Sequence, residues 1–188
     1  FGSPMTAGGP IYGIFACSKA YMRQMPGRIV GRTIDEDEQT AFCLTLSTRE
    51  QHIRRHRATS NLCTNETLIA LMGAMHMSLL GPEGVRALAV RNAAALHAVV
   101  DALQGVDGVE FVHPGGYHFN EIAVRLPGAA ADCISALEAH GVLPGFDLGR
   151  WSDDRADQLL VTATDQTRPE EIERLAKAMA AWCAEVVA

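Results

Sequence analysis

The first part of the chain alternates between short apolar runs and polar turns, a pattern typical of strands and short helices. Branched and aromatic residues fill the apolar runs, and an acidic turn, residues 35–38, joins two of them. In chain order, these signals predict a buried strand at 11–16, a short helix at 18–25, strands at 28–33 and 41–46 that pair as a hairpin, and a helix at 49–57 capped by Thr48.

The centre of the chain carries two helical signals with a break between them. Residues 62–80 are apolar on nearly every side, which predicts a helix buried on several faces. Gly81 and Pro82 interrupt the pattern, because glycine and proline both disfavour a continuing helix. Apolar residues then recur at a 3.6-residue spacing over 83–103, which predicts a second helix.

The last part of the chain mixes strand and helix signals, as an α/β domain does. The predicted elements are strands at 109–113, 118–126, 142–143 and 158–164, helices at 129–140 and 168–187, and a loop at 144–154. We therefore expect residues 85–188 to form a small α/β domain with a mainly antiparallel sheet. Residues 1–84 would be the tail of a different, larger domain with an interdomain helix.

Composition indicates an ordinary globular protein, since 48% of the 188 residues are hydrophobic and 20% are charged. The five cysteines are odd in number, lie far apart and include no C-x-x-C pair, which argues against a disulfide framework or a zinc site. A reducing, cytoplasmic setting is expected. We expect no membrane span, because no uninterrupted apolar run approaches that length, and we interpret the chain, which begins Phe1-Gly2, as a fragment trimmed at its N-terminal side.

The net charge of −6 is unevenly distributed. Residues 1–57 carry eight Lys or Arg against five Asp or Glu, and the basic excess concentrates in residues 49–57. A nucleic-acid site would need this patch to be longer and interleaved with aromatic residues, so no nucleic-acid binding is expected. A solvated helix face, or a face that docks an acidic partner subunit, explains the same residues.

The stretch from Arg57 to Glu66 holds more hydroxyl and amide side chains than a helix cap requires. Such groups accept hydrogen bonds from the first N–H groups of a helix, so the stretch predicts a cap for the apolar segment that follows. A helix N-terminus also favours negative charge, so the same residues are candidates for a phosphate or carboxylate site. Both interpretations stay open for Thr59, Ser60, Asn61, Thr64 and Asn65.

Other candidate groups lack partners. His52 and His56 have the i, i+4 spacing of a metal-binding helix, but no glutamate follows His52 and no third ligand is evident, so no metal is expected. Cys63 has no identifiable base beside it. The only amines, Lys19 and Lys177, lie in contexts that do not indicate a Schiff base, so we assign no catalytic residue.

Four segments stand out when taken in order: GGPIYGIFA at 8–16, RQMPGRIVG at 23–31, TREQHIRR at 48–55 and ATSNLCTN at 58–65. Together they resemble the glycine cleavage system P-protein family, and most closely the N-terminal-type subunit of its split bacterial form. Residues 144–151 and 159–165 resemble the same family, so the resemblance covers essentially the whole chain.

The resemblance implies a pyridoxal-phosphate enzyme of the aspartate-aminotransferase fold (fold type I), here the end of its large domain and its small C-terminal domain. The family decarboxylates glycine and transfers the aminomethyl group to the lipoyl arm of the H-protein. Its Schiff-base lysine belongs to the second subunit, so this subunit would complete the active site of a lysine-bearing partner and be inactive alone. The implied cofactor contacts are Thr59, Ser60 and Asn61, with Thr64 behind them, and Arg28 for a carboxylate or a structural ion pair.

Two alternatives stay open at this point. The first is another fold type I enzyme, such as a class V aminotransferase or a cysteine desulfurase, which a Schiff-base lysine just upstream of Phe1 would favour. The second is a non-catalytic scaffold subunit that only docks and stabilises a partner.

Overall fold

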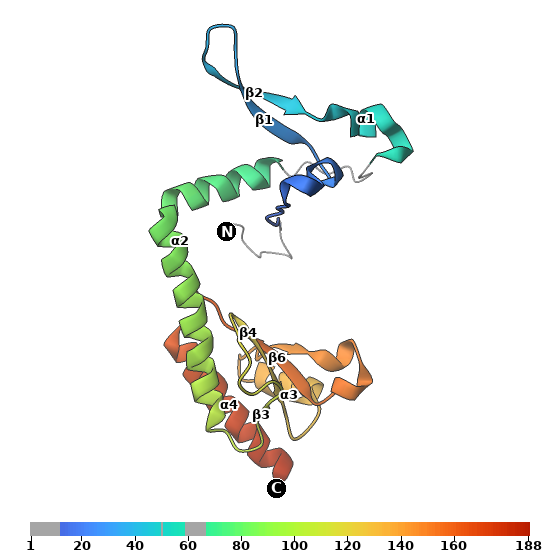
Figure 1. The fold of residues 1–188 in the computed structure, drawn as a ribbon. Coiled ribbons are helices and arrows are strands. Elements are labelled where there is room, and N and C mark those ends of the chain that lie inside the picture. The colour runs from blue at the N-terminus through green and yellow to red at the C-terminus, as the bar shows by residue number, and fades with distance from the viewer. Residues whose placement is uncertain (1–11, 50, 59–66) are drawn as a thin grey trace. The chain divides into compact units, whose positions relative to one another are not determined.

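The structure, a computed structural model, describes residues 12–49, 51–58 and 67–188. It divides the chain into two compact units, Phe1–Leu80 and Gly81–Ala188 (Figure 1). This division lies close to the boundary expected after residue 84. That the first unit is the tail of a larger domain stays a prediction.

A two-stranded antiparallel hairpin is the most regular part of the first unit. Strands β1 (Ile29–Ile34) and β2 (Thr40–Thr45) pair from Ile29 opposite Thr45 to Ile34 opposite Thr40. The acidic turn is closed by Asp35, whose side-chain oxygen accepts backbone N–H hydrogen bonds from Asp37 (3.0 Å) and Gln39 (2.8 Å). The predicted hairpin is therefore confirmed, with its strand limits shifted by one residue.

Two other predictions for this unit are wrong. Residues 12–16 form no strand; the next element is a 3₁₀ helix, Lys19–Gln24, where a short helix was expected. The helix expected over 49–57 is broken into short pieces because Arg55 has a φ of 54°, a left-handed conformation that an α-helix does not contain. The pieces are 3₁₀ turns at Ser47–Arg49 and Arg55–Arg57, with α1 (Gln51–Arg54) between them.

Helix α2 (Thr67–Gln104) consists of two helical parts that meet at Gly81 and Pro82, which confirms the expected break. Gly81 has a φ of 64° and a ψ of 179°, and Pro82 follows, so the helix kinks at this point. By length and composition α2 could cross a membrane, with a mean hydropathy of 1.3 over its most apolar stretch. The kink leaves residues 67–80 shorter than the roughly 20 residues that a span needs. The part after Pro82 supplies Leu96, Val99 and Leu103 to a core.

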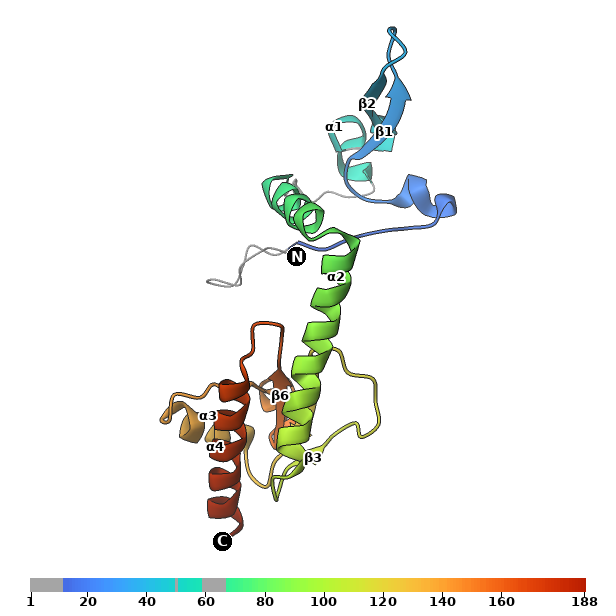
Figure 2. The same ribbon diagram turned by 90° about the vertical axis from the view of Figure 1, so that its left-hand side faces the viewer.

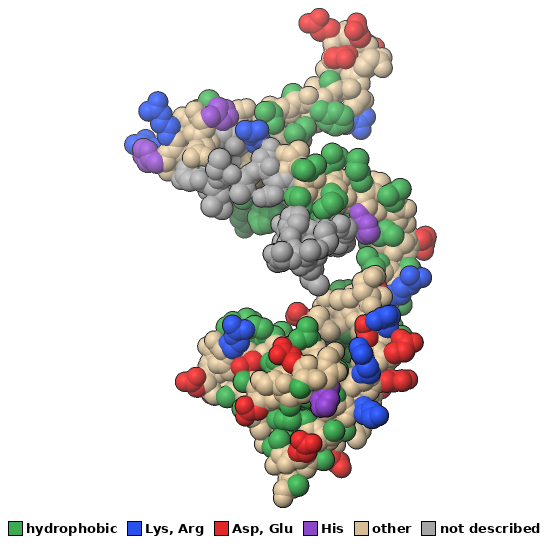
Figure 3. Space-filling view, turned by 180° about the vertical axis from the view of Figure 1, so that it is seen from behind, with side chains coloured by type: hydrophobic (Ala, Val, Ile, Leu, Met, Phe, Trp, Pro, Cys, Tyr) green, Lys and Arg blue, Asp and Glu red, His purple; other side chains and the backbone are tan. Residues whose placement is uncertain are grey.

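Apolar side chains of the first unit are mostly at its surface. Leu68 is 75% exposed and Leu79 88%, so the prediction that this helical segment is buried on several faces is wrong within this chain. Of the residues described in 12–80, no large hydrophobic side chain is buried. Figure 3 shows these side chains on the hairpin and on the first part of α2. On the hairpin they are Val30, Ile34, Phe42 and Leu44.

The second unit is built on a four-stranded antiparallel sheet in the order β3-β4-β6-β5, which confirms the expected mainly antiparallel sheet. Alternate residues of the two central strands face the core as cross-strand pairs: Ile122 opposite Val161, and Val124 opposite Leu159. The strands are β3 (Glu110–Phe111), β4 (Glu121–Arg125), β5 (Phe146–Asp147) and β6 (Gln158–Thr162).

Helices α3 (Ala130–Glu138) and α4 (Pro169–Val187), with the later part of α2, supply the rest of this core (Figure 2). Leu103, Leu137 and Met179 are completely or almost completely buried against the sheet side chains. The strand expected at 142–143 is wrong: the edge strand β5 lies at 146–147, within the segment expected to be a loop.

Candidate functional site

The hydroxyl and amide cluster lies outside the described residues. Thr59, Ser60, Asn61 and Thr64 all fall in the segment 59–66, so their role as phosphate contacts stays a prediction. The described chain resumes at Thr67, the first residue of α2.

Arg28, the remaining candidate residue, lines a small pocket at the base of the hairpin. The pocket encloses about 50 Å³. His52 from α1 faces it from a segment 24 positions further along the chain. Two hydroxyl residues, Thr45 and Ser47, line the same pocket, and its remaining lining residues are Ile29 and Leu44.

The register of the hairpin explains why these residues meet. Since Ile29 pairs with Thr45, Arg28 lies just outside the last pair, beside the point where the chain leaves β2. The Thr45 hydroxyl fixes this end of the hairpin by donating a hydrogen bond to the Ile29 carbonyl oxygen (3.2 Å). Leu46 then takes a φ of 57°, which turns the chain out of the strand and into the short helical pieces that carry Ser47 and His52.

The segment that carries His52 into this pocket is rich in basic residues. Residues 51–57 contain two histidines and three arginines, all exposed, and no acidic residue. The acidic residues 35–38 occupy the tip of the hairpin, at the opposite end of its strands from Arg28 (Figure 3). No acidic side chain is among the residues that line the pocket. An anionic group is therefore the ligand that this end of the hairpin favours.

Neither lysine lies in a site suited to a Schiff base. Lys19 is exposed on the short 3₁₀ helix Lys19–Gln24. Lys177 lies on α4 and lines an open groove between α3 and α4, with the charged side chains of Arg174 and Glu185 beside it. Neither lysine is therefore a buried amine of the kind that binds a carbonyl cofactor.

The described residues also offer no metal site. The broken helix at Arg55 separates His52 from His56, so the two do not share one helix face. His113 and His118, which flank the Pro-Gly-Gly turn, are linked instead by a contact of 3.3 Å between the His118 ring Nε2 and the His113 carbonyl oxygen. Within the part of the chain that the structure describes, no three His, Cys, Asp or Glu side chains are grouped to hold a metal ion.

Comparison with known proteins decides the family. The model of the family described as "Glycine cleavage system P-protein" matches residues 1–179, almost the whole chain. The chain belongs to the glycine cleavage system P-protein family. This assignment confirms the resemblance carried by the four sequence segments.

Relatives within the P-protein family are similar over nearly all of this chain. A protein named probable glycine dehydrogenase (decarboxylating) subunit 1 from Caulobacter vibrioides is 50% identical over 181 residues, 95% of this chain and 40% of that protein. A protein of the same name from Desulfovibrio desulfuricans is 46% identical over 94% of this chain and 40% of that protein. The chain thus spans about two fifths of the length of these relatives.

Solved structures show the same family fold. The crystal structure of glycine decarboxylase (P-protein) of the glycine cleavage system, in inhibitor-bound form, matches with a TM-score of 0.85 and 38% identity, over 97% of this chain and 40% of that chain. A NifS-like protein matches with a TM-score of 0.51 at 13% identity, over 70% of this chain and 37% of that chain, which shows a shared fold alone. The chain therefore has the expected α/β fold of the aspartate-aminotransferase type (fold type I).

The sequence indicated Arg28 as a site residue but not the residues that line the hairpin pocket with it. His52 was considered with His56 as half of a metal site and within the basic segment 49–57, and Ser47 was not considered. The hairpin register was the available signal, because it places Arg28 next to the exit of β2 and therefore near Ser47. His52 reaches the pocket because the chain turns at Leu46, and this turn depends on a left-handed backbone conformation that the sequence does not predict.

Proposed function

We propose that this chain is part of a glycine decarboxylase P-protein, which decarboxylates glycine with pyridoxal phosphate and transfers the aminomethyl group to the lipoyl arm of the H-protein. The observation that carries this proposal is the family match over residues 1–179 together with 46–50% identity to proteins named glycine dehydrogenase (decarboxylating) subunit 1. The proposed setting is cytoplasmic, with no membrane or nucleic-acid partner.

The chain's part in this activity is to complete the active site of a partner subunit that carries the Schiff-base lysine. The two lysines support this division, since Lys19 is exposed on a short 3₁₀ helix and Lys177 borders an open groove. The first unit supports it as well. Its exposed apolar side chains on the hairpin and on residues 67–80 need cover that the described part of this chain does not supply.

The described residues do not by themselves fit pyridoxal phosphate. The pocket at Arg28 has a volume of about 50 Å³, too little for a pyridine ring with its phosphate, because pockets that bury such ligands measure roughly 300–1,000 Å³. We therefore assign no reaction step to the described residues. The proposed phosphate contacts are the cluster Thr59, Ser60, Asn61 and Thr64, reaching a cofactor held mainly by the partner.

The first test asks which subunit forms the Schiff base. The full-length protein is mixed with pyridoxal phosphate, with and without its partner subunit, reduced with borohydride and mapped by peptide analysis. Label on a partner lysine alone supports the proposal. Label on this chain would make it a catalytic subunit of its own and favour another fold type I enzyme, such as a class V aminotransferase or a cysteine desulfurase.

A second test separates a cofactor role from a scaffold role. Thr59→Ala combined with Ser60→Ala is expected to weaken cofactor affinity of the assembled complex by roughly tenfold or more, because hydrogen bonds to a charged phosphate are lost. Thr48→Ala, a hydroxyl outside the cluster, is the matched control. Unchanged affinity in the double variant would leave only a scaffold role for this segment.

A further inference from the structure

We propose that the pocket formed by Arg28, Ser47 and His52 is a binding site for a single carboxylate group. The inference deepens the proposed function and rests on it, because the substrate of that function carries a carboxylate and its partner subunit carries acidic side chains. It rests on the hydrogen-bonding groups that line the pocket, on the lack of partners for Arg28 and His52 among the described residues, and on the apolar side chains beside them.

The polar groups in this pocket are suited to an anion. The guanidinium of Arg28 presents several N–H donors in a planar fork that matches the two oxygens of a carboxylate. The Ser47 hydroxyl and the His52 ring add two further groups that can donate. Thr45, by contrast, already donates its hydroxyl hydrogen to Ile29 and has none to offer a ligand.

Arg28 and His52 have no partner of their own among the described residues. The described ion pairs lie elsewhere, between Arg125 and Asp157 and between Arg168 and Glu171. A cationic side chain that lines a pocket and faces no acidic group among the described residues favours an anion from outside them.

The lining of this small pocket, about 50 Å³ in volume, favours a carboxylate over a phosphate. A phosphate carries three or four oxygens that need donors, whereas two of the six lining residues are apolar. The side chains of Ile29 and Leu44 complete the lining and suit the short aliphatic stem beside a carboxylate. The carboxylate of the small substrate and an acidic side chain of the partner subunit share this chemistry.

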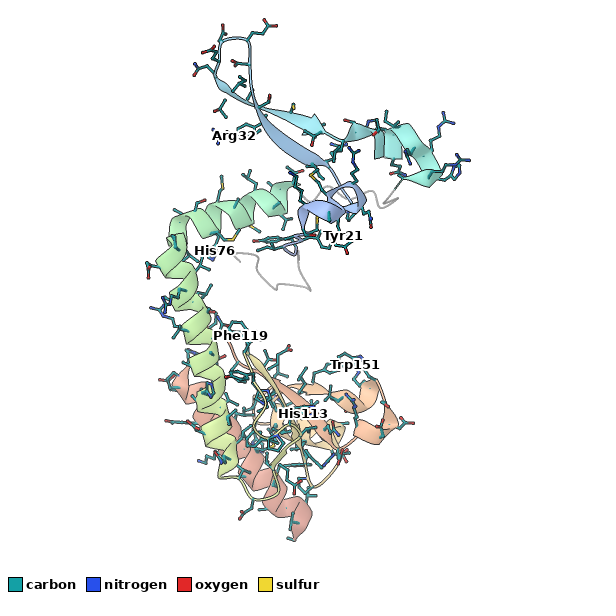
Figure 4. All side chains as sticks on the ribbon, viewed as in Figure 1. Tyr21, Arg32, His76, His113, Phe119 and Trp151 are labelled. Carbon is teal, nitrogen blue, oxygen red and sulfur yellow. The ribbon has the colours of Figure 1, made fainter. Side chains whose placement is uncertain are left out.

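The test compares Arg28→Gln and Arg28→Lys in the full-length protein assembled with its partner. Arg32→Gln is the matched control, since Arg32 lies on β1, the strand that directly follows Arg28, and does not line the pocket (Figure 4). Two constants are measured for each variant: the KM for glycine at saturating partner, and the dissociation constant of the partner subunit. Circular dichroism verifies that each variant has the secondary structure of the natural protein.

Arg28→Gln is expected to raise one of these two constants by about tenfold to a hundredfold. Arg28→Lys should raise the same constant by a smaller factor, and Arg32→Gln should leave both constants at the values of the natural protein. A raised KM identifies the substrate carboxylate, and a raised dissociation constant identifies an acidic side chain of the partner. If both constants stay unchanged, or if only the affinity for pyridoxal phosphate falls, the carboxylate site is wrong.

Failure of the proposed function is distinguishable from failure of this site. If the natural protein does not assemble with a lysine-bearing partner or shows no glycine decarboxylation, the proposed function fails. The pocket is then tested in the full-length protein alone, by following the His52 ring signals by NMR during titration with acetate and with inorganic phosphate. Saturable changes of the His52 ring signals with acetate, absent in Arg28→Gln, support the carboxylate site. If acetate causes no change, or if phosphate causes a stronger one, the carboxylate site is wrong.

Discussion

The thiol of Cys133 on α3 lies 3.6 Å from the thioether sulfur of Met179 on α4, and both side chains are completely buried. This contact joins the two helices at the centre of the core of the second unit. We expect Met179→Ala to lower the free energy of unfolding by about 3 kcal/mol, because it leaves a cavity among well-packed neighbours. Urea unfolding measures the change. Val187→Ala, on the exposed end of α4, should change it by less than about 0.5 kcal/mol, and equal effects would contradict the prediction.

The buried thiols should resist alkylation while the exposed ones react. Burial, and to a lesser degree the neighbouring Cys183, raises the pKa of Cys133 to about 12, and burial also raises the pKa of Cys183. Almost no reactive thiolate is then present at neutral pH. Iodoacetamide followed by peptide mapping should label the exposed Cys17 and Cys43 in the native protein, and Cys133 and Cys183 only after unfolding. Equal labelling of all four in the native protein would contradict this prediction.

The start of α4 should stabilise the fold in a pH-dependent way. Hydrogen bonds from the Arg168 side chain (2.7 Å) and from its backbone N–H (2.9 Å) hold Glu171 and lower the pKa of its carboxyl. Because the folded-state pKa is depressed, the stabilisation is complete above the ordinary glutamate pKa of about 4.3 and is lost as the pH falls through the lower value. Glu171→Gln should therefore lower the Tm at neutral pH and converge with the natural protein in acid. A difference in Tm between the two proteins that stays constant at all pH values would show that the charge of Glu171 does not contribute to the stabilisation.

Two glycines in neighbouring turns should respond very differently to a methyl group. A Cβ at Gly145, which has a φ of 154°, would collide with the Leu160 carbonyl oxygen of the adjacent strand. At Gly141, with a φ of 71°, a Cβ would meet nothing within 4 Å. Gly145→Ala should cost about 3 kcal/mol of unfolding free energy and Gly141→Ala about 1 kcal/mol, the cost of a left-handed conformation alone. Urea unfolding of the two variants side by side tests the difference, and similar losses would refute the collision.

The sequence predicted the elements whose signals are local and strong. The hairpin, α3, α4 and the strands β4 and β6 follow from alternation, helical spacing and turn residues, and all lie within a few residues of the predicted limits. The edge strand β5 escaped prediction because its two residues carry no alternation, and pairing with β6 alone defines it. The helix over 49–57 failed because Arg55 takes a left-handed φ that no sequence signal announces.

The residues of the candidate site likewise include one that the sequence predicted and one that it did not. Arg28 was found because it stands in a recognisable turn, whereas His52 joins it only through the path of the chain after Leu46. The sequence showed that residues 62–80 are apolar, but an apolar sequence does not establish that the segment is buried within this chain. Hydrophobic periodicity indicates that a surface needs to be covered, but not whether the covering residues belong to the same polypeptide.

The exposed apolar side chains of residues 12–80 also bear on how the protein is maintained in a cell. A copy that lacks its cover presents Leu68, Leu79 and the hairpin side chains to chaperones and proteases, which act on exposed hydrophobic segments. Under the proposed function, a partner subunit provides this cover, and its supply would then set how much of this chain persists. Balanced synthesis of the two polypeptides, rather than the stability of either, would govern the amount of assembled protein.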